Sequence, residues 1–116
     1  MPIPSRLLVT IGGFGGPHYE VRWSRRKLRY HSDELQAAVM PTDEAWKSFW
    51  AALDRINVWG WAAHYDDLEI LDGTQWELDL SNGTRRVKCS GSNAYPPEFE
   101  QFLAAVEALV GQPFGR

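Results

Sequence analysis

The sequence predicts an α+β domain in which an antiparallel sheet of about five strands carries two amphipathic helices on one face. Three observations support this prediction. A strand–turn–strand pattern spans residues 70–91, and two apolar stripes at helical spacing occupy residues 46–56 and 99–110. The predicted order β-β-β-α-β-β-α separates strands from helices in a way that is typical of α+β domains.

Composition predicts one soluble domain. The chain of 116 residues is 44% hydrophobic with six Trp, which is enough for one core and leaves little length for a second. Its net charge of −3 disfavours nucleic acids and anionic membranes as partners. The N-terminal apolar run is too short for a signal peptide, and no stretch approaches the roughly 20 apolar residues of a membrane span. We therefore expect a single domain, residues 1–116, in the cytoplasm.

The first half of the chain predicts three strands and a helix. Residues 5–11 form a β-branched apolar run that ends at glycine-rich residues 12–17. Residues 18–23 alternate in polarity, and residues 28–30 continue that alternation after a turn at residues 24–27. We expect residues 32–41 to form a polar connector, with a short turn of helix around residues 34–39. A helix should then begin after Thr42, whose side chain can cap it.

The strand pairing near residues 70–91 is predicted residue by residue. Asn82 and Gly83 favour a two-residue type I′ turn, because both tolerate the positive φ that this turn requires. Counting outward from the turn sorts charged pairs to one face and apolar pairs to the other. The expected pairs are Asp79–Arg86 and Glu77–Lys88 on the polar face, with Leu78–Val87 and Trp76–Cys89 on the apolar face.

The last element is an amphipathic helix over residues 99–110. Proline precedes it at residues 96 and 97, and Gly111 and Pro113 supply its stop. Residues 57–73 lie between the first predicted helix and the hairpin. Their apolar residues follow neither helical nor strand spacing. We expect an ordered loop or a ragged helix end there, crossing from helix to hairpin.

The start of the second strand carries a resemblance to known proteins. Residues 14–21 read Phe-Gly-Gly-Pro-His-Tyr-Glu-Val, and a mid-chain helix, a hairpin and a closing helix follow. In this pattern the chain resembles small bacterial domains of unknown function that open a strand with Gly-Pro-x-Tyr, although the cysteines often found there are absent. The resemblance implies the fold and no activity.

Two patterns indicate candidate ligand sites without predicting one strongly. The glycine-rich residues 12–16 lack phosphate-loop spacing and precede a strand, so we expect a connector. The acidic loop could hold a hard cation or a carboxylate pair, although it lacks the calcium-loop pattern. Its candidate residues are His64, Asp66, Asp67, Glu69 and Asp72. We expect a solvated loop, with no metal and no cofactor, and keep a ligand-binding, metal-binding or hydrolytic pocket near His64, Asp66 and Asp72 as the alternative.

Five cations fall within eight residues around the turn that includes Arg25 and Arg26. A phosphate-binding tip with Trp23 and Tyr30 for stacking is one interpretation, and a solvated turn is favoured by the negative charge of the whole chain. The contrast with the acidic loop also suits a protein partner or a second copy of the chain.

Two tryptophans leave a choice between packing and binding. Trp59 and Trp61 flank Gly60 in the irregular segment, where exposed aromatic side chains would form an interface or a sugar-stacking platform. Packing is favoured, because aromatic side chains usually lie inside.

No motif predicts catalysis, since Cys89 should face the core and no nucleophile-elbow spacing occurs. We therefore expect no enzyme. The sequence favours a small protein-binding or regulatory domain that uses its sheet face or residues 59–72.

Overall fold

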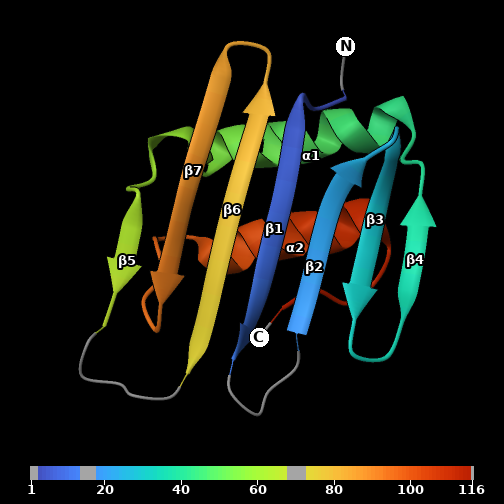
Figure 1. The fold of residues 1–116 in the computed structure, drawn as a ribbon. Helices are drawn as coiled ribbons and strands as arrows, with labels where there is room; N and C mark the ends of the chain where they lie inside the picture. Colours follow the sequence, from blue (N-terminus) through green and yellow to red (C-terminus); the bar gives the residue numbers. More distant parts are fainter. Residues whose placement is uncertain (1–2, 14–17, 68–72, 116) are drawn as a thin grey trace.

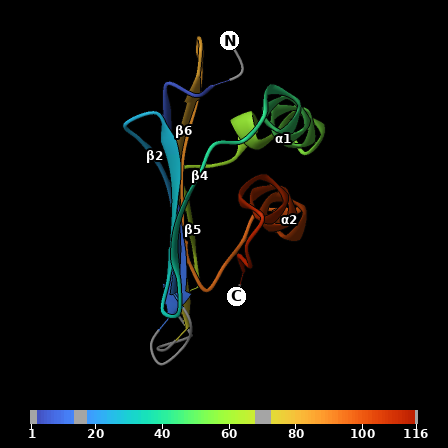
Figure 2. The ribbon, with the colours of Figure 1, turned by 90° about the vertical axis from the view of Figure 1, so that its right-hand side faces the viewer.

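The computed structural model describes residues 3–13, 18–67 and 73–115 and confirms the α+β class. Seven strands of these residues form one sheet, and two helices cover one of its faces (Figures 1 and 2). The elements in chain order are β1 (Arg6–Gly13), β2 (His18–Ser24), β3 (Lys27–Ser32), β4 (Gln36–Val39), α1 (Asp43–Arg55), the 3-10 helix η1 (Val58–Gly60), β5 (His64–Asp66), β6 (Thr74–Asn82), β7 (Arg85–Ser92) and α2 (Phe99–Val110).

The sheet has the strand order β4-β3-β2-β1-β6-β7-β5, so the first strand of the chain lies at its centre. The expected sheet of about five antiparallel strands is therefore wrong in two respects. Residues 36–39, expected near a turn of helix, form edge strand β4, because the Ser32 hydroxyl accepts the amides of Glu34 and Leu35 and reverses the chain. Strand β5 forms the other edge and runs parallel to β7.

The β6–β7 hairpin differs from the prediction in register by two residues. Its turn is Gly83-Thr84, and Gly83 alone of the two has positive φ, +64°, as a type II′ turn requires. Asn82 stays in the strand. Because the shift is two residues, every side chain keeps its predicted face. The observed pairs are Asp79–Lys88, Glu77–Ser90, Leu78–Cys89, Leu80–Val87 and Trp76–Gly91.

Apolar packing explains this register. Leu80 lies opposite Val87, whereas the predicted register would have placed Arg85 there. Trp76 lies opposite Gly91, where a Cβ would come within 2.2 Å of the indole Nε1. The absence of a side chain at Gly91 leaves room for the indole, whose Nε1 donates to the carbonyl oxygen of Ala94 at 2.9 Å. The gain in apolar pairing therefore outweighs the preference of Asn-Gly for the turn.

The core lies between the helices and the covered face of the sheet. Trp46 and Trp50 of α1 and Trp76 of β6 are all buried, as the apolar pattern predicted. Helix α1 begins where expected, since the Thr42 hydroxyl accepts the amide of Ala45 at 3.1 Å. Helix α2 ends at Gly111, whose φ of +71° places it in the left-handed region. Neither helix is long and apolar enough to span a membrane.

Candidate functional site

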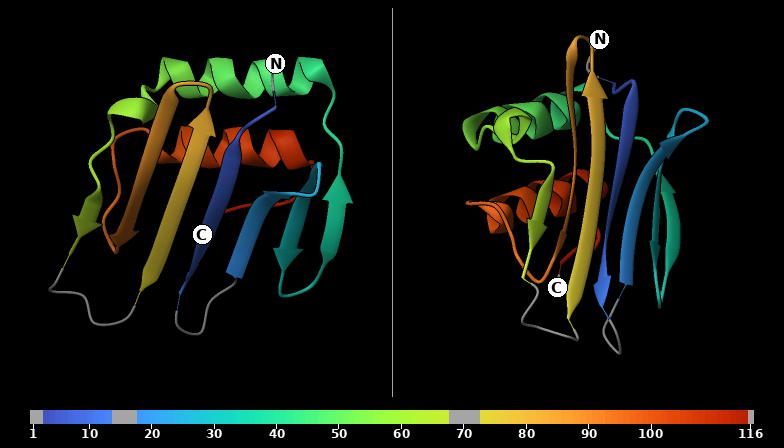
Figure 3. Two further views of the ribbon diagram at one scale, coloured as in Figure 1. Left: turned by 45° about the horizontal axis from the view of Figure 1, so that its top comes forward. Right: turned by 60° about the vertical axis from the view of Figure 1, so that its left-hand side comes forward.

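The face of the sheet opposite the helices is bare (Figures 2 and 3). Side chains alternate across a sheet, so the residues between the buried positions of each strand lie on this bare side, which we call the open face. Leu7, Val9 and Ile11 of β1, for example, are buried beneath the helices, and Leu8 and Thr10 lie on the open face. Neither α1 nor α2 therefore covers this side of the sheet.

The open face collects most of the positive charge of the chain. Of the twelve Lys and Arg residues, eight lie on this face or in the β2–β3 turn, against four of the fifteen acidic residues, within the described part of the chain. The basic residues are Arg6, Arg22, Arg25, Arg26, Lys27, Arg29, Arg86 and Lys88, and the acidic ones are Glu20, Asp66, Glu77 and Asp79. The open face is therefore positive although the chain as a whole is negative.

The β2–β3 hairpin is where this charge is densest. Its turn projects from the sheet on the side away from the helices, as Figures 2 and 3 show. Arg22 lies directly opposite Arg29 in the register of the two strands. Like charges in that position repel each other and destabilise the pairing.

The turn of this hairpin is strained. Arg25 and Arg26 have φ values of +54° and +62°, which is the left-handed region for both central residues of a two-residue turn. A residue with a Cβ loses about 1–2 kcal/mol in this region, and Asn or Gly is the usual occupant. The protein thus places two arginines where turn geometry favours other residues.

Acidic partners are scarce around the hairpin. Arg22 Nε lies 3.6 Å from Glu20 Oε2. Across residues 3–13, 18–67 and 73–115, no carboxylate lies within 4.0 Å of the charged groups of Arg25, Arg26 or Arg29. These guanidinium groups are therefore available to an acidic partner.

The open face carries no Phe, Tyr or Trp side chain among its described residues. Trp23 and Tyr30, which the sequence placed near the cations, both face the helices. The Trp23 ring packs edge-on against Trp46 at 5.5 Å between centroids. The Tyr30 hydroxyl donates to the carbonyl oxygen of Pro113 at 2.6 Å. Neither ring is placed to stack on a base bound at the open face.

Trp59 and Trp61 are partly exposed and pack against the core. Trp59 stacks on Trp50 at 6.0 Å, and its Nε1 donates to Asp54 Oδ1 at 2.9 Å. The Arg85 guanidinium lies 4.7 Å from the centre of the Trp59 ring and donates to the same carboxylate at 2.6 Å. This contact joins η1, α1 and the start of β7.

Trp61 packs farther along the same side of the sheet. Its ring lies 5.5 Å from that of Phe102 and 6.5 Å from that of Trp76. The two tryptophans therefore pack on the helix side and do not share a surface with Arg25 and Arg26.

The acidic candidates lie at the β5 edge. His64 Nδ1 is 3.4 Å from Ser90 Oγ, and the amide of Asp67 donates to the carbonyl oxygen of Ser92 at 2.9 Å. Asp66 lines a hollow of about 390 Å³ on the open face. The other lining residues are Thr10, Gln75, Trp76, Glu77, Ser90, Gly91 and Ser92. Glu69 and Asp72 lie outside the described residues, and no group of three potential metal ligands occurs among those described.

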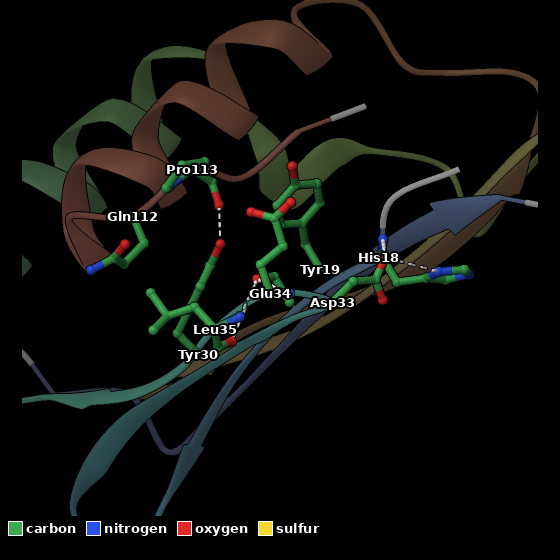
Figure 4. Close-up of a pocket in the computed structure, with 9 residues that line it drawn as sticks. His18, Tyr19, Tyr30, Asp33, Glu34, Leu35, Gln112 and Pro113 are labelled. Atoms are coloured by element: carbon green, nitrogen blue, oxygen red, sulfur yellow. Dashed lines mark hydrogen bonds and ion pairs between the residues drawn. The ribbon is translucent and has the colours of Figure 1, made fainter. Parts of the chain in front are cut away.

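A second hollow, of about 270 Å³, lies at the opposite end of the sheet and was not predicted (Figure 4). The carboxylate of Asp33 accepts the amide of His18 at 3.1 Å and lies 3.8 Å from its Nδ1. Tyr19, Tyr30 and Pro113 also line it. No local pattern could have revealed it, because its wall combines β2, β3, the β3–β4 turn and the segment after α2.

Two nucleophilic side chains in or near these regions, those of Ser32 and Cys89, are engaged or buried. The Ser32 hydroxyl at the second hollow accepts the amide of Leu35 at 3.1 Å. Cys89 is buried, and burial raises the pKa of its thiol from 9.0 to about 12. A neutral thiol without access to solvent is a poor nucleophile.

Comparison with known proteins adds no family, since no protein-family model and no curated protein matches the chain.

Proposed function

We propose that this protein is a non-enzymatic binding domain that recognises an acidic surface of another protein through its open face, centred on the β2–β3 hairpin. The eight cations of that face supply the attraction. Their concentration on one side attracts an acidic partner at long range, although the chain as a whole has a net charge of −3.

One observation carries this proposal. The hairpin combines two arginines in left-handed backbone with two more directly opposed across the strands. Both features destabilise the folded protein. Strain and repulsion of this kind persist where binding uses them, and carboxylates of a partner would relieve the repulsion.

An acidic protein fits this surface better than a nucleic acid does. Single-stranded nucleic acids are held by aromatic stacking as well as by charge, and the described residues of the open face supply no Phe, Tyr or Trp ring. The acidic residues elsewhere would also repel a long polyanion that extends beyond the face.

The experiment compares two double variants with the same change in net charge. Arg25→Glu/Arg26→Glu reverses the charge of the hairpin turn, and Lys47→Glu/Arg55→Glu reverses two exposed cations of α1. Each is immobilised beside the wild-type protein and exposed to extract of the native host, once untreated and once treated with nuclease. We expect one protein to be retained by the wild type and by the α1 variant. The hairpin variant should lose it, and raised salt should release it from the wild type.

Retention of the same protein by the hairpin variant would contradict the proposal. Binding that nuclease treatment abolishes would assign the surface to nucleic acid instead. Circular dichroism of each variant checks that a loss of binding does not reflect unfolding.

A further inference from the structure

The two edge strands of the sheet differ in how well they are protected against pairing with another chain. Natural edge strands avoid pairing with other chains by being short, by carrying charges or proline, or by bulging. Strand β5 has three residues, of which His64 and Asp66 are polar and exposed. Strand β4 reads Gln-Ala-Ala-Val and contains no charge and no proline. Figure 2, which looks onto that side of the sheet, shows β4 in front of the other strands.

Exposed apolar side chains flank β4 at both ends. Leu35 precedes the strand and is 43% exposed, and Met40 follows it and is 73% exposed. Ile3 is the only other large hydrophobic residue of comparable exposure in the described part of the chain. Leu35 and Met40 therefore mark the two ends of this edge of the sheet.

The hydrogen bonds to β3 show which backbone groups of β4 remain open. The amide of Ser32 donates to the carbonyl oxygen of Leu35 at 2.8 Å, so Leu35 belongs to a bonded pair of this ladder. Bonded and non-bonded pairs alternate in antiparallel strands. Ala37 and Val39 therefore bond to β3, and the amides and carbonyls of Gln36, Ala38 and Met40 face the free edge.

We infer that β4 pairs with β4 of a second copy of this chain, in antiparallel orientation about a two-fold axis at Ala38. The open groups then complement themselves, because Ala38 faces the partner's Ala38 and Gln36 faces the partner's Met40. Each of these pairs can exchange two backbone hydrogen bonds. The neighbouring Ala37 faces the partner's Val39 on the side of the helices.

A second copy suits this edge because self-pairing opposes no like charges on β4 itself. Only a register that pairs residues of equal parity keeps the apolar sides together, and the register centred on Ala38 also uses all three open positions. The two sheets would become continuous, with all helices on one side and both open faces on the other. This inference does not rest on the proposed function, although a dimer would double the basic surface.

The test uses Ala38, whose amide points outward and takes no part in the β3–β4 ladder. Ala38→Pro removes that donor, and proline is tolerated at the outer side of an edge strand. Ala38→Ser is the matched control, since it keeps the donor and a small side chain. Ala38→Lys keeps every backbone group and opposes two lysines at the axis, so it covers the case in which the proline variant does not fold.

Sedimentation velocity over about a hundredfold range of concentration should show wild type and Ala38→Ser passing from monomer to dimer by mass action. Ala38→Pro and Ala38→Lys should remain monomeric throughout. Hydrogen exchange should show the amides of Gln36 and Ala38 becoming protected in the wild-type dimer, whereas that of Ala37 is protected at every concentration.

A wild-type protein that stays monomeric would overturn the inference, and so would a dimer that survives both the proline and the lysine substitution. A dimer without protection at Gln36 and Ala38 would place the contact on another surface and overturn it equally. The Arg25→Glu/Arg26→Glu variant changes a different surface. Whether it still captures a partner protein therefore does not bear on the dimer.

Discussion

At the scale of single residues, Cys89 shows how burial sets chemistry. Its thiol is 2% exposed on the covered face of β7, opposite Leu78. The sequence predicted a buried, inert thiol from the apolar pattern of the hairpin. The burial is confirmed even though the expected neighbour, Trp76, is not the residue opposite it. The shift of two residues explains why, because it changes partners and preserves faces.

The raised pKa of Cys89 predicts a loss of stability in alkali. Unfolding returns the thiol to a pKa near 9.0, whereas the folded protein keeps it protonated up to about pH 12. The contribution of this thiol is therefore constant below pH 9.0 and falls as the pH rises from there toward 12, by at most about 1.4 kcal/mol per pH unit.

Urea unfolding of the wild type and of Cys89→Ala at increasing pH measures this effect. Taking the difference between the two proteins removes the contributions of the other titrating groups. We expect the advantage of the wild type to shrink above pH 9.0. A difference that does not change with pH would show that the thiol ionises equally in both states.

At the scale of elements, the two-residue turn of the β2–β3 hairpin lowers the stability of the fold. Replacing Arg25 and Arg26 by Asn and Gly should stabilise the fold by about 1–3 kcal/mol, because these residues adopt positive φ at lower cost. The midpoint of urea unfolding should rise with an unchanged m value.

Arg25→Gln/Arg26→Gln is the control for this turn, since it removes both charges and leaves the backbone cost in place. It should gain less than the Asn-Gly variant. Equal gains would attribute the cost to charge repulsion and contradict the backbone explanation.

Elements with strong local signals were predictable, and those held by tertiary pairing were not. Thr42 capped its helix and Gly111 ended the other, because capping depends on residues close in sequence. Strands β4 and β5 have four and three residues, and their hydrogen-bond partners lie in other strands. The segment Gln-Ala-Ala-Val contains good helix formers, so sequence alone favoured a turn of helix there.

The candidate sites show the same limit. The density of cations at Arg25 and Arg26 was visible in the sequence because they are neighbours along the chain. The hollow beside Tyr19 and Pro113 was not, because four segments build it. The opposition of Arg22 and Arg29 could be seen only once the register of the two strands was known.

At the scale of the whole molecule, the segment after α2 closes the core. Phe114 is 4% exposed, and its ring lies 5.7 Å from that of Tyr19 on β2. Its amide donates to Glu107 Oε1 at 3.0 Å, and the preceding carbonyl oxygen accepts the Tyr30 hydroxyl. This segment thus fastens α2 to the far half of the sheet.

Phe114→Ala should therefore destabilise the protein by about 3–5 kcal/mol, since it removes a buried aromatic ring and leaves a cavity against Tyr19. Thermal and urea unfolding measure the change. Gln112→Ala, two residues earlier and only half-buried, should change stability by no more than about 0.5 kcal/mol. A loss below about 1 kcal/mol for Phe114→Ala would show that this end of the core closes without the ring.

The central position of β1 has a consequence for folding during synthesis. Strand β1 pairs on one side with β2, the next strand along the chain, and on the other with β6, which is made much later. Arg6 meets Asp79 only after 73 further residues have been made. During synthesis, β1 therefore has one edge without its partner strand, and the apolar face of the partial sheet is still exposed. Both features slow folding and favour the binding of chaperones to the growing chain.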